Sequence, residues 1–147
     1  MLLENNCLYN FVDCTMDFSP YKLLILPDVS GFNDETVSKI KAFAANGGKI
    51  IASGESLIKD GKFIIDTGAE YLGENEFNPT YLIPCYETAN GVTEYIMRCK
   101  SYKIDANDCE IEAYVQNPYF NRTAEHFCSH AHAPNNPEAS FPAAVIN

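Results

Sequence analysis

Residues 21–28 have the sequence YKLLILPD, a short apolar run that stops at Pro27-Asp28. A continuous apolar run of this length, ended by a turn signal, is typical of a strand that is buried on both faces of a parallel sheet. Residues 49–52, KIIA, form a second run of the same kind directly after Gly47-Gly48. The two runs predict neighbouring parallel strands, and they decide the fold of this part of the chain.

The segment between the two runs predicts a helix. Asn33 is a suitable N-cap, because its side-chain oxygen can accept a hydrogen bond from a backbone N–H of the first turn. The apolar residues that follow recur at helical spacing and fall on one face, which we expect to be buried: Val37, Ile40, Phe43 and Ala44. Gly47 and Gly48 can end the helix without Cβ strain. Strand, helix and strand together predict a right-handed βαβ unit.

The second half of the chain has a different pattern, because glycine and proline divide it into short pieces. Residues 110–115 alternate between polar and apolar side chains, which predicts a half-exposed strand. We expect residues 93–104 to be its antiparallel neighbour, joined to it by the turn-forming residues 105–108. From Pro118 onward we expect an irregular tail, since Pro134, Pro137 and Pro142 interrupt it.

Composition excludes several classes of protein. The 147 residues suit one compact domain, and 20 acidic against 10 basic residues give a formal net charge of -10. This charge disfavours binding to nucleic acid or to an anionic membrane surface, since both depend on clustered lysine and arginine. Six dispersed cysteines predict buried, reduced thiols. The N-terminus of the chain does not have the pattern of an export signal, which leaves the location unknown between bacterial cytoplasm and periplasm. Both ends suggest a fragment of a larger protein.

Residues 17–28 and 47–54 resemble the class I glutamine-amidotransferase-like fold. More narrowly, they resemble the β-galactosidase trimerisation-type domain that follows the catalytic barrel in some bacterial glycoside hydrolases. Residues 118–130, PYFNRTAEHFCSH, resemble a stretch of hypothetical glycosidases of Bacteroides type. The resemblance implies an α/β fold with a three-layer, flavodoxin-like parallel sheet and an additional antiparallel β hairpin.

On this interpretation residues 1–147 form a single amidotransferase-like domain. Residues 1–75 are its βαβ part, and residues 76–147 are its loop and β-hairpin part. An active amidotransferase has a cysteine nucleophile on the turn after the second strand, whereas this turn is Ser53-Gly54-Glu55-Ser56. Since the thiolate cannot be omitted from that chemistry, we expect no catalytic residue here.

A candidate ligand site lies where the two strands end. Asp28 follows the first strand, and Ser53, Gly54 and Glu55 follow the second. Ligands of open α/β sheets bind at the carboxyl ends of the strands, so these residues could hold a small molecule such as a sugar. The alternative is that they only form turns and helix caps.

A candidate metal site lies near the C-terminus, where all three histidines fall within seven residues: His126, His130 and His132. Zinc requires three or four ligands, so Cys128 or a carboxylate would have to complete the set. Such a site would make the chain a metal-dependent enzyme or sensor. The alternative is a polar loop whose histidines form ordinary hydrogen bonds or face a partner domain.

The lack of a complete catalytic set favours an accessory or oligomerisation domain of a carbohydrate-active enzyme. We expect the chain to act without a cofactor, with zinc as the alternative. The expected partners are the catalytic barrel of the same parent chain and neighbouring subunits, and a homo-oligomer is expected. The link to glycosidases is a resemblance of fold and motif, which by itself does not establish activity.

Overall fold

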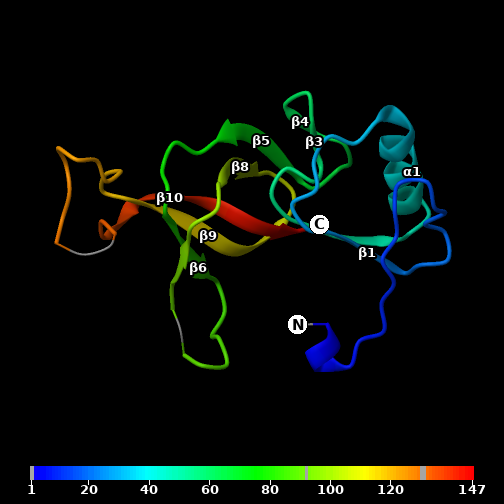
Figure 1. The fold of residues 1–147 in the computed structure, drawn as a ribbon, viewed down its shortest axis with the longest axis horizontal. Helices are drawn as coiled ribbons and strands as arrows, with labels where there is room; N and C mark the ends of the chain where they lie inside the picture. Colours follow the sequence, from blue (N-terminus) through cyan, green and yellow to red (C-terminus); the bar gives the residue numbers. More distant parts are fainter. Residues whose placement is uncertain (1, 92, 130–131) are drawn as a thin grey trace.

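The computed structural model describes residues 2–91, 93–129 and 132–147 (Figure 1). Its elements, in chain order, are η1 (Leu3–Asn5), β1 (Leu23–Leu26), α1 (Asp34–Ala45), β2 (Lys49–Ala52), β3 (Ile58–Lys59), β4 (Lys62–Phe63), β5 (Ala69–Glu74), β6 (Thr80–Pro84), β7 (Tyr95–Met97), β8 (Tyr102–Ala106), β9 (Glu110–Pro118) and β10 (Asn135–Ile146). No helix among the described residues is long and apolar enough to span a bilayer.

The predicted strand–helix–strand unit is present as β1, α1 and β2. The two strands pair in parallel, with Leu24 opposite Ile50 and Leu26 opposite Ala52. The Asn33 side chain accepts a hydrogen bond from the Thr36 N–H at 2.8 Å, as expected of an N-cap. The buried residues of α1 are Thr36, Val37, Ile40 and Phe43, so the predicted apolar face is the buried one.

The predicted fold class is wrong. Strands predominate in the structure, and α1 is the one α-helix in the described part of the chain. The parallel pair β1–β2 forms a sheet of its own, whereas the other described strand pairs are antiparallel. The described residues therefore do not form the three-layer, flavodoxin-like parallel sheet. The apolar run of residues 21–26 suggested burial on both faces, but β1 buries alternate residues only.

The second half of the chain folds into antiparallel sheets. Strands β10, β9, β6 and β7 form a four-stranded sheet in that order, and β5 pairs with β8. The expected hairpin between residues 93–104 and 110–115 is wrong, because β9 pairs with β6 and β10 instead. Local alternation predicted the strand itself but could not identify its partners, which lie about 30 residues away on either side in the sequence.

The expected irregular tail is also wrong, because residues 135–146 form the long strand β10. This strand tolerates Pro137 and Pro142 because it lies at the edge of the sheet, where a missing N–H need not interrupt the pairing. Its register against β9 shifts between Asn135 and Ser140 and again on either side of Ala144. Proline therefore indicated an edge strand here rather than a loop.

The main core lies between α1 and the strands β1 and β2. It is built from Phe18, Leu24, Leu26, Ile40, Phe43 and Leu57. A second, polar contact joins the antiparallel sheets, where the buried Asn75 side-chain N–H groups donate to Ser101 Oγ at 3.0 Å and Asn117 Oδ1 at 2.7 Å. Cys7, Cys14, Cys85 and Cys99 are exposed, so the prediction that the cysteines are buried is wrong for these four.

Candidate functional site and interaction surfaces

The structure brings together three of the four residues predicted at the strand ends. The Asp28 N–H donates to Ser53 Oγ at 3.1 Å, which ties the end of β1 to the end of β2. Gly54 has φ +58°, and a Cβ there would lie 2.4 Å from the Asp28 carboxylate oxygen Oδ1. Only glycine allows this close approach and this backbone conformation together.

The hydroxyl groups of Ser53 and Ser56 hold the residues that follow β1 against the turn that follows β2. Ser56 Oγ accepts a hydrogen bond from the Val29 N–H at 2.8 Å and lies 2.9 Å from the Leu26 carbonyl oxygen. Ser56 is buried, while Asp28 is exposed. The Asp28 carboxylate is thus the polar group that faces solvent here, and the predicted ligand site stays a prediction.

Glu55 has a different environment, because its side chain faces the antiparallel part of the molecule. Burial raises the pKa of the Tyr102 hydroxyl to about 12, helped by the negative charge of Glu55 and a hydrogen bond to it. Glu55 also lines a cavity of about 160 Å³ together with Ser56 and Phe32. It therefore links β2 to β8, a role that its position in the sequence did not reveal.

The two described histidines, His126 and His132, contact different residues. The His126 ring stacks on the Phe120 ring, with centroids 4.0 Å apart and planes 12° apart. Nε2 of His132 lies 3.0 Å from the Arg98 guanidinium, and since a guanidinium only donates, Nε2 accepts. His130 lies outside the described residues. Among those described, no three His, Cys, Asp or Glu side chains are grouped to hold a metal ion, and the zinc site stays a prediction.

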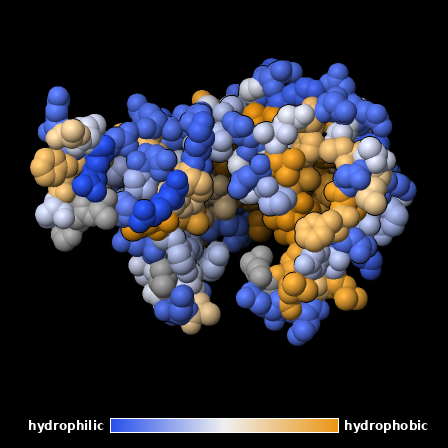
Figure 2. All heavy atoms as spheres, viewed as in Figure 1, coloured by the Kyte–Doolittle hydropathy of each residue, from blue (hydrophilic) through white to orange (hydrophobic). Residues whose placement is uncertain are grey.

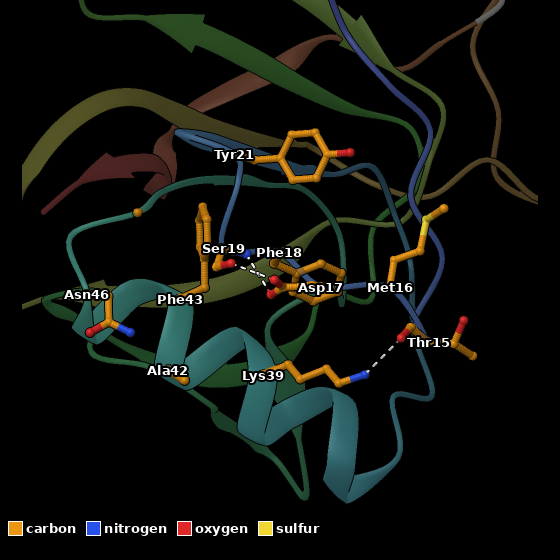
Figure 3. A pocket seen from close by; sticks show the side chains of 11 residues that line it. Thr15, Met16, Asp17, Phe18, Ser19, Tyr21, Lys39, Ala42, Phe43 and Asn46 are labelled. Carbon is orange, nitrogen blue, oxygen red and sulfur yellow. Dashed lines mark hydrogen bonds between the residues drawn. The ribbon is translucent and has the colours of Figure 1, made fainter.

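A cavity of about 480 Å³ that the sequence did not indicate lies between residues 15–21 and α1 (Figure 3). Phe18 and Phe43 supply its apolar wall, and Lys39 lies at one side. Gly48 also lines it, and a Cβ at that position would lie 2.4 Å from the Phe43 ring. The cavity is therefore shaped by the packing of the helix against the segment that precedes β1.

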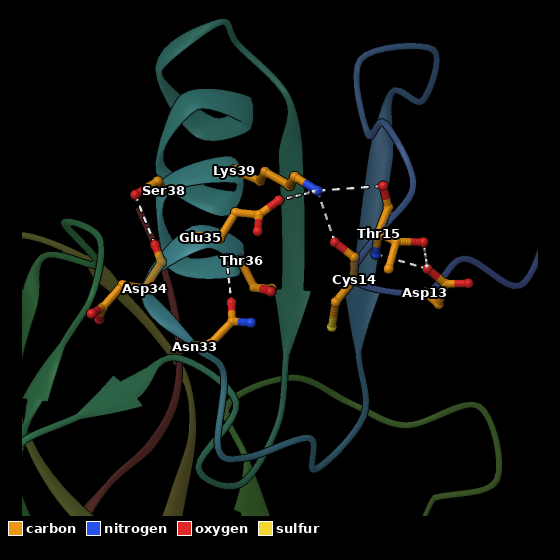
Figure 4. A network of polar contacts seen from close by, with 9 residues as sticks. All are labelled: Asp13, Cys14, Thr15, Asn33, Asp34, Glu35, Thr36, Ser38 and Lys39. Carbon is orange, nitrogen blue, oxygen red and sulfur yellow. Dashed lines mark hydrogen bonds and ion pairs between the residues drawn. The ribbon is translucent and has the colours of Figure 1, made fainter.

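Polar contacts fasten this segment to the helix (Figure 4). The Lys39 ammonium donates to the carbonyl oxygen of Cys14 at 2.9 Å and pairs with Glu35 at 3.2 Å. The Asp13 carboxylate accepts hydrogen bonds from the hydroxyl and the N–H of Thr15, which lower its pKa. These contacts involve exposed groups, so they orient the segment more than they stabilise it.

One face of the β1–β2 sheet carries exposed apolar residues next to the exposed Lys49, which pairs with Leu23. Leu23, Ile25 and Ile51 are 42%, 38% and 55% exposed, on the face opposite the residues that pack against α1. Leu8 and Phe11 of the N-terminal segment are exposed as well. Figure 2 shows hydrophobic residues gathered on the side of the molecule that carries β1 and the N-terminus. We call Leu23, Ile25 and Ile51 the strand face. Exposed apolar surface of this kind marks a site of interaction.

A second exposed feature projects from the opposite end of the molecule, between β9 and β10 (Figure 1). We call residues 119–129 the arm. Tyr119 and Phe127 are 62% and 65% exposed there. Asn121 anchors the base of the arm, because its Oδ1 accepts from the Asn78 N–H at 3.0 Å and its Nδ2 donates to the Glu76 carbonyl at 2.8 Å.

Comparison with known proteins identifies the family of the chain. Residues 1–80, more than half of the 147, match the family of the β-galactosidase trimerisation domain. The chain belongs to that family. It is an accessory, non-catalytic domain of a glycoside hydrolase, which confirms the function predicted from the sequence. The resemblance to the trimerisation domain is confirmed too, whereas the amidotransferase-like fold is not supported.

Relatives of this trimerisation domain are larger enzymes. β-Galactosidase GanA of Bacillus subtilis strain 168 is 31% identical over 115 residues, which cover 73% of this chain and 17% of GanA. α-L-Fucosidase isoenzyme 2 from Paenibacillus thiaminolyticus is 36% identical, with a TM-score of 0.92 over 99% of this chain and 23% of the fucosidase. Gan42B, a GH42 β-galactosidase, shares the fold at 18% identity, with a TM-score of 0.57 over 90% of this chain and 20% of its own. The chain thus spans about a fifth of the length of such proteins.

Proposed function

We propose that this trimerisation domain holds its parent enzyme together by packing its strand face against the remainder of the same polypeptide, the catalytic barrel included. The observation that carries the proposal is the one-sided burial of the β1–β2 sheet. Residues Leu24 and Leu26 are buried against α1, whereas Leu23 and Ile25, which alternate with them, are exposed.

Parallel sheets are found almost only with both faces covered, because their strands are apolar on both sides. Each strand-face residue that becomes fully covered contributes about 1 kcal/mol, at about 25 cal/mol per Å² of apolar surface. Three such residues at the centre of a contact would make it resistant to separation. The acidic character of the chain does not oppose this contact, since Leu23, Ile25 and Ile51 carry no charge and Lys49, which lies beside them, is basic.

The test is Ile51→Asp in the full-length parent enzyme, with Leu72→Asp as the matched control. Leu72 lies on β5 and is 59% exposed, compared with 55% for Ile51. We expect Ile51→Asp to separate one cooperative thermal transition into two, because a charge buried at the contact is unpaired. Leu72→Asp should leave the transition unchanged. A single unchanged transition for both variants would contradict the proposal.

We also propose that the parent enzyme hydrolyses α-L-fucosides. Support comes from the fucosidase of Paenibacillus thiaminolyticus, which is similar over 99% of this chain at 36% identity. The β-galactosidase Gan42B has the same fold at only 18% identity, and its TM-score is lower. An accessory domain that packs on a barrel must complement its surface, so the closer likeness of the domain favours the fucosidase barrel as the parent.

The competing substrate is a β-galactoside, which the names of the family and of GanA suggest. Initial rates of the full-length enzyme with the p-nitrophenyl α-L-fucoside and β-D-galactoside decide between them. We expect kcat/KM to be at least about 100-fold higher for the fucoside, since a site built to hydrogen-bond one sugar leaves buried polar groups unpaired with another. A higher value for the galactoside would contradict this proposal and leave the assembly proposal unaffected.

A further inference from the structure

The arm is the most prominent feature that packing of the strand face leaves unexplained. It lies at the end of the four-stranded sheet, far from β1 and α1 in the structure (Figure 1). Two aromatic side chains in it, Tyr119 and Phe127, are more than 60% exposed. Tyr is among the residues that most often dominate the energy of a protein–protein contact, and Phe is enriched at the centre of such contacts.

Hydrogen bonds within the single chain hold the arm in its conformation. At its base Asn121 forms two hydrogen bonds with the loop of residues 76–78, and the Tyr119 N–H donates to the Pro134 carbonyl at 3.0 Å. Further out, the Thr123 N–H donates to the His126 carbonyl at 2.8 Å, and Thr123 Oγ1 accepts from the His126 N–H at 3.0 Å. This turn places the His126 ring on the Phe120 ring. A surface held in place in this way loses little entropy when it binds.

Charge indicates which partner the arm suits. The chain has a formal net charge of -10, yet within the arm the single Arg122 balances the single Glu125. Two copies of so acidic a chain repel one another when they approach through most of their surface. Because the two charges within the arm cancel, a second copy can approach the arm without adding to that repulsion. A neutral, aromatic projection therefore fits a second acidic copy.

We propose that the arm is a subunit contact: residues 119–129 of one copy pack against a neighbouring copy of the parent enzyme, with Tyr119 and Phe127 at the centre of the contact. The inference rests on the proposed assembly function and adds the surface by which it acts between copies. The strand face then joins the domain to its own polypeptide, and the arm joins one polypeptide to the next.

The test uses the full-length parent enzyme and compares Tyr119→Ser with Tyr86→Ser. The two tyrosines are 62% and 61% exposed, but Tyr86 lies in the loop between β6 and β7, which leaves the sheet in another direction (Figure 1). Phe127→Ser is a second, independent arm variant. The molar mass of each protein is measured by light scattering after size exclusion over a dilution series, and its fold is checked by circular dichroism.

We expect each arm variant to dissociate at a concentration about tenfold or more above that of the wild type, as for the loss of a central aromatic contact residue. Tyr86→Ser should dissociate as the wild type does. Arm variants that keep the wild-type mass at every dilution would overturn the arm proposal alone. A wild-type enzyme that is a monomer at every dilution would also overturn the arm proposal, whereas the strand-face proposal, which concerns contacts within one polypeptide, would stand or fall with the Ile51→Asp test.

Discussion

Removal of the buried Ile40 side chain gives the sharpest test of how α1 is held. Ile40 is 0% exposed and belongs to the cluster formed by Phe18, Leu24, Leu26, Phe43 and Leu57. The substitution Ile40→Ala deletes three carbon atoms, which costs about 2.4 kcal/mol at about 0.8 kcal/mol per buried methylene group. A residual cavity of about 50 Å³ adds about 1.2 kcal/mol. The expected total is therefore about 3 to 4 kcal/mol.

The assay is amide hydrogen exchange on peptides of α1 in the full-length parent enzyme. Exchange through local opening should accelerate by about 100-fold or more for Ile40→Ala, because each 1.4 kcal/mol changes the open population about tenfold. Ile40→Val should give a smaller change, of about 1 kcal/mol. Leu72→Ala, on the exposed side of β5, serves as the control. The packing argument is refuted if Ile40→Ala accelerates exchange no more than Leu72→Ala does.

Three further predictions concern local geometry and pH. Gly48→Ala should destabilise α1 by at least about 1 kcal/mol in the same exchange assay, because the Cβ of the alanine would lie 2.4 Å from the Phe43 ring. Unchanged exchange would contradict this prediction and show that the ring can move aside. Asn33→Ala should lower the stability of α1 by about 1 kcal/mol, because the hydrogen bond from the Thr36 N–H to the cap is lost. Asn33→Asp should retain most of that stability, and equal losses of stability for the two variants would contradict the capping role. Burial should raise the pKa of Tyr102 from its ordinary value of 10.0 to about 12, so the stability it confers is present below pH 10 and lost as the pH rises through 12. The ultraviolet difference titration of wild type minus Tyr102→Phe measures this pKa, and a midpoint near pH 10 would contradict the burial of the hydroxyl.

Local signals in the sequence predicted the first half of the chain well. Asn33, the helical spacing of Val37, Ile40 and Phe43, and the apolar run KIIA each act over a few residues, and the structure contains the corresponding cap, buried face and strand. The same signals could not show how many strands join the sheet. Apolar residues such as Ile25 predicted burial, but the surface that would cover them is not supplied by the described residues of this chain.

The second half depended on contacts between distant residues, which no local pattern specifies. Leu82 in β6 pairs with Val115 in β9, but the sequence of neither strand indicates this partner. Pro137 and Pro142 suggested a loop because proline cannot donate to a ladder, yet an edge strand accommodates them. At the strand ends, adjacency of Asp28 and Ser53 followed from the parallel pairing, whereas the contact of Glu55 with Tyr102 needed the tertiary fold.

The central claim is that this domain assembles its parent enzyme. The most direct test is the molar mass of the full-length wild-type enzyme in solution, measured by light scattering from high to low micromolar concentration. Membership of the trimerisation family leads us to expect three copies that persist on dilution. The mass of a single polypeptide throughout that range would contradict the claim that the domain joins copies of its parent enzyme.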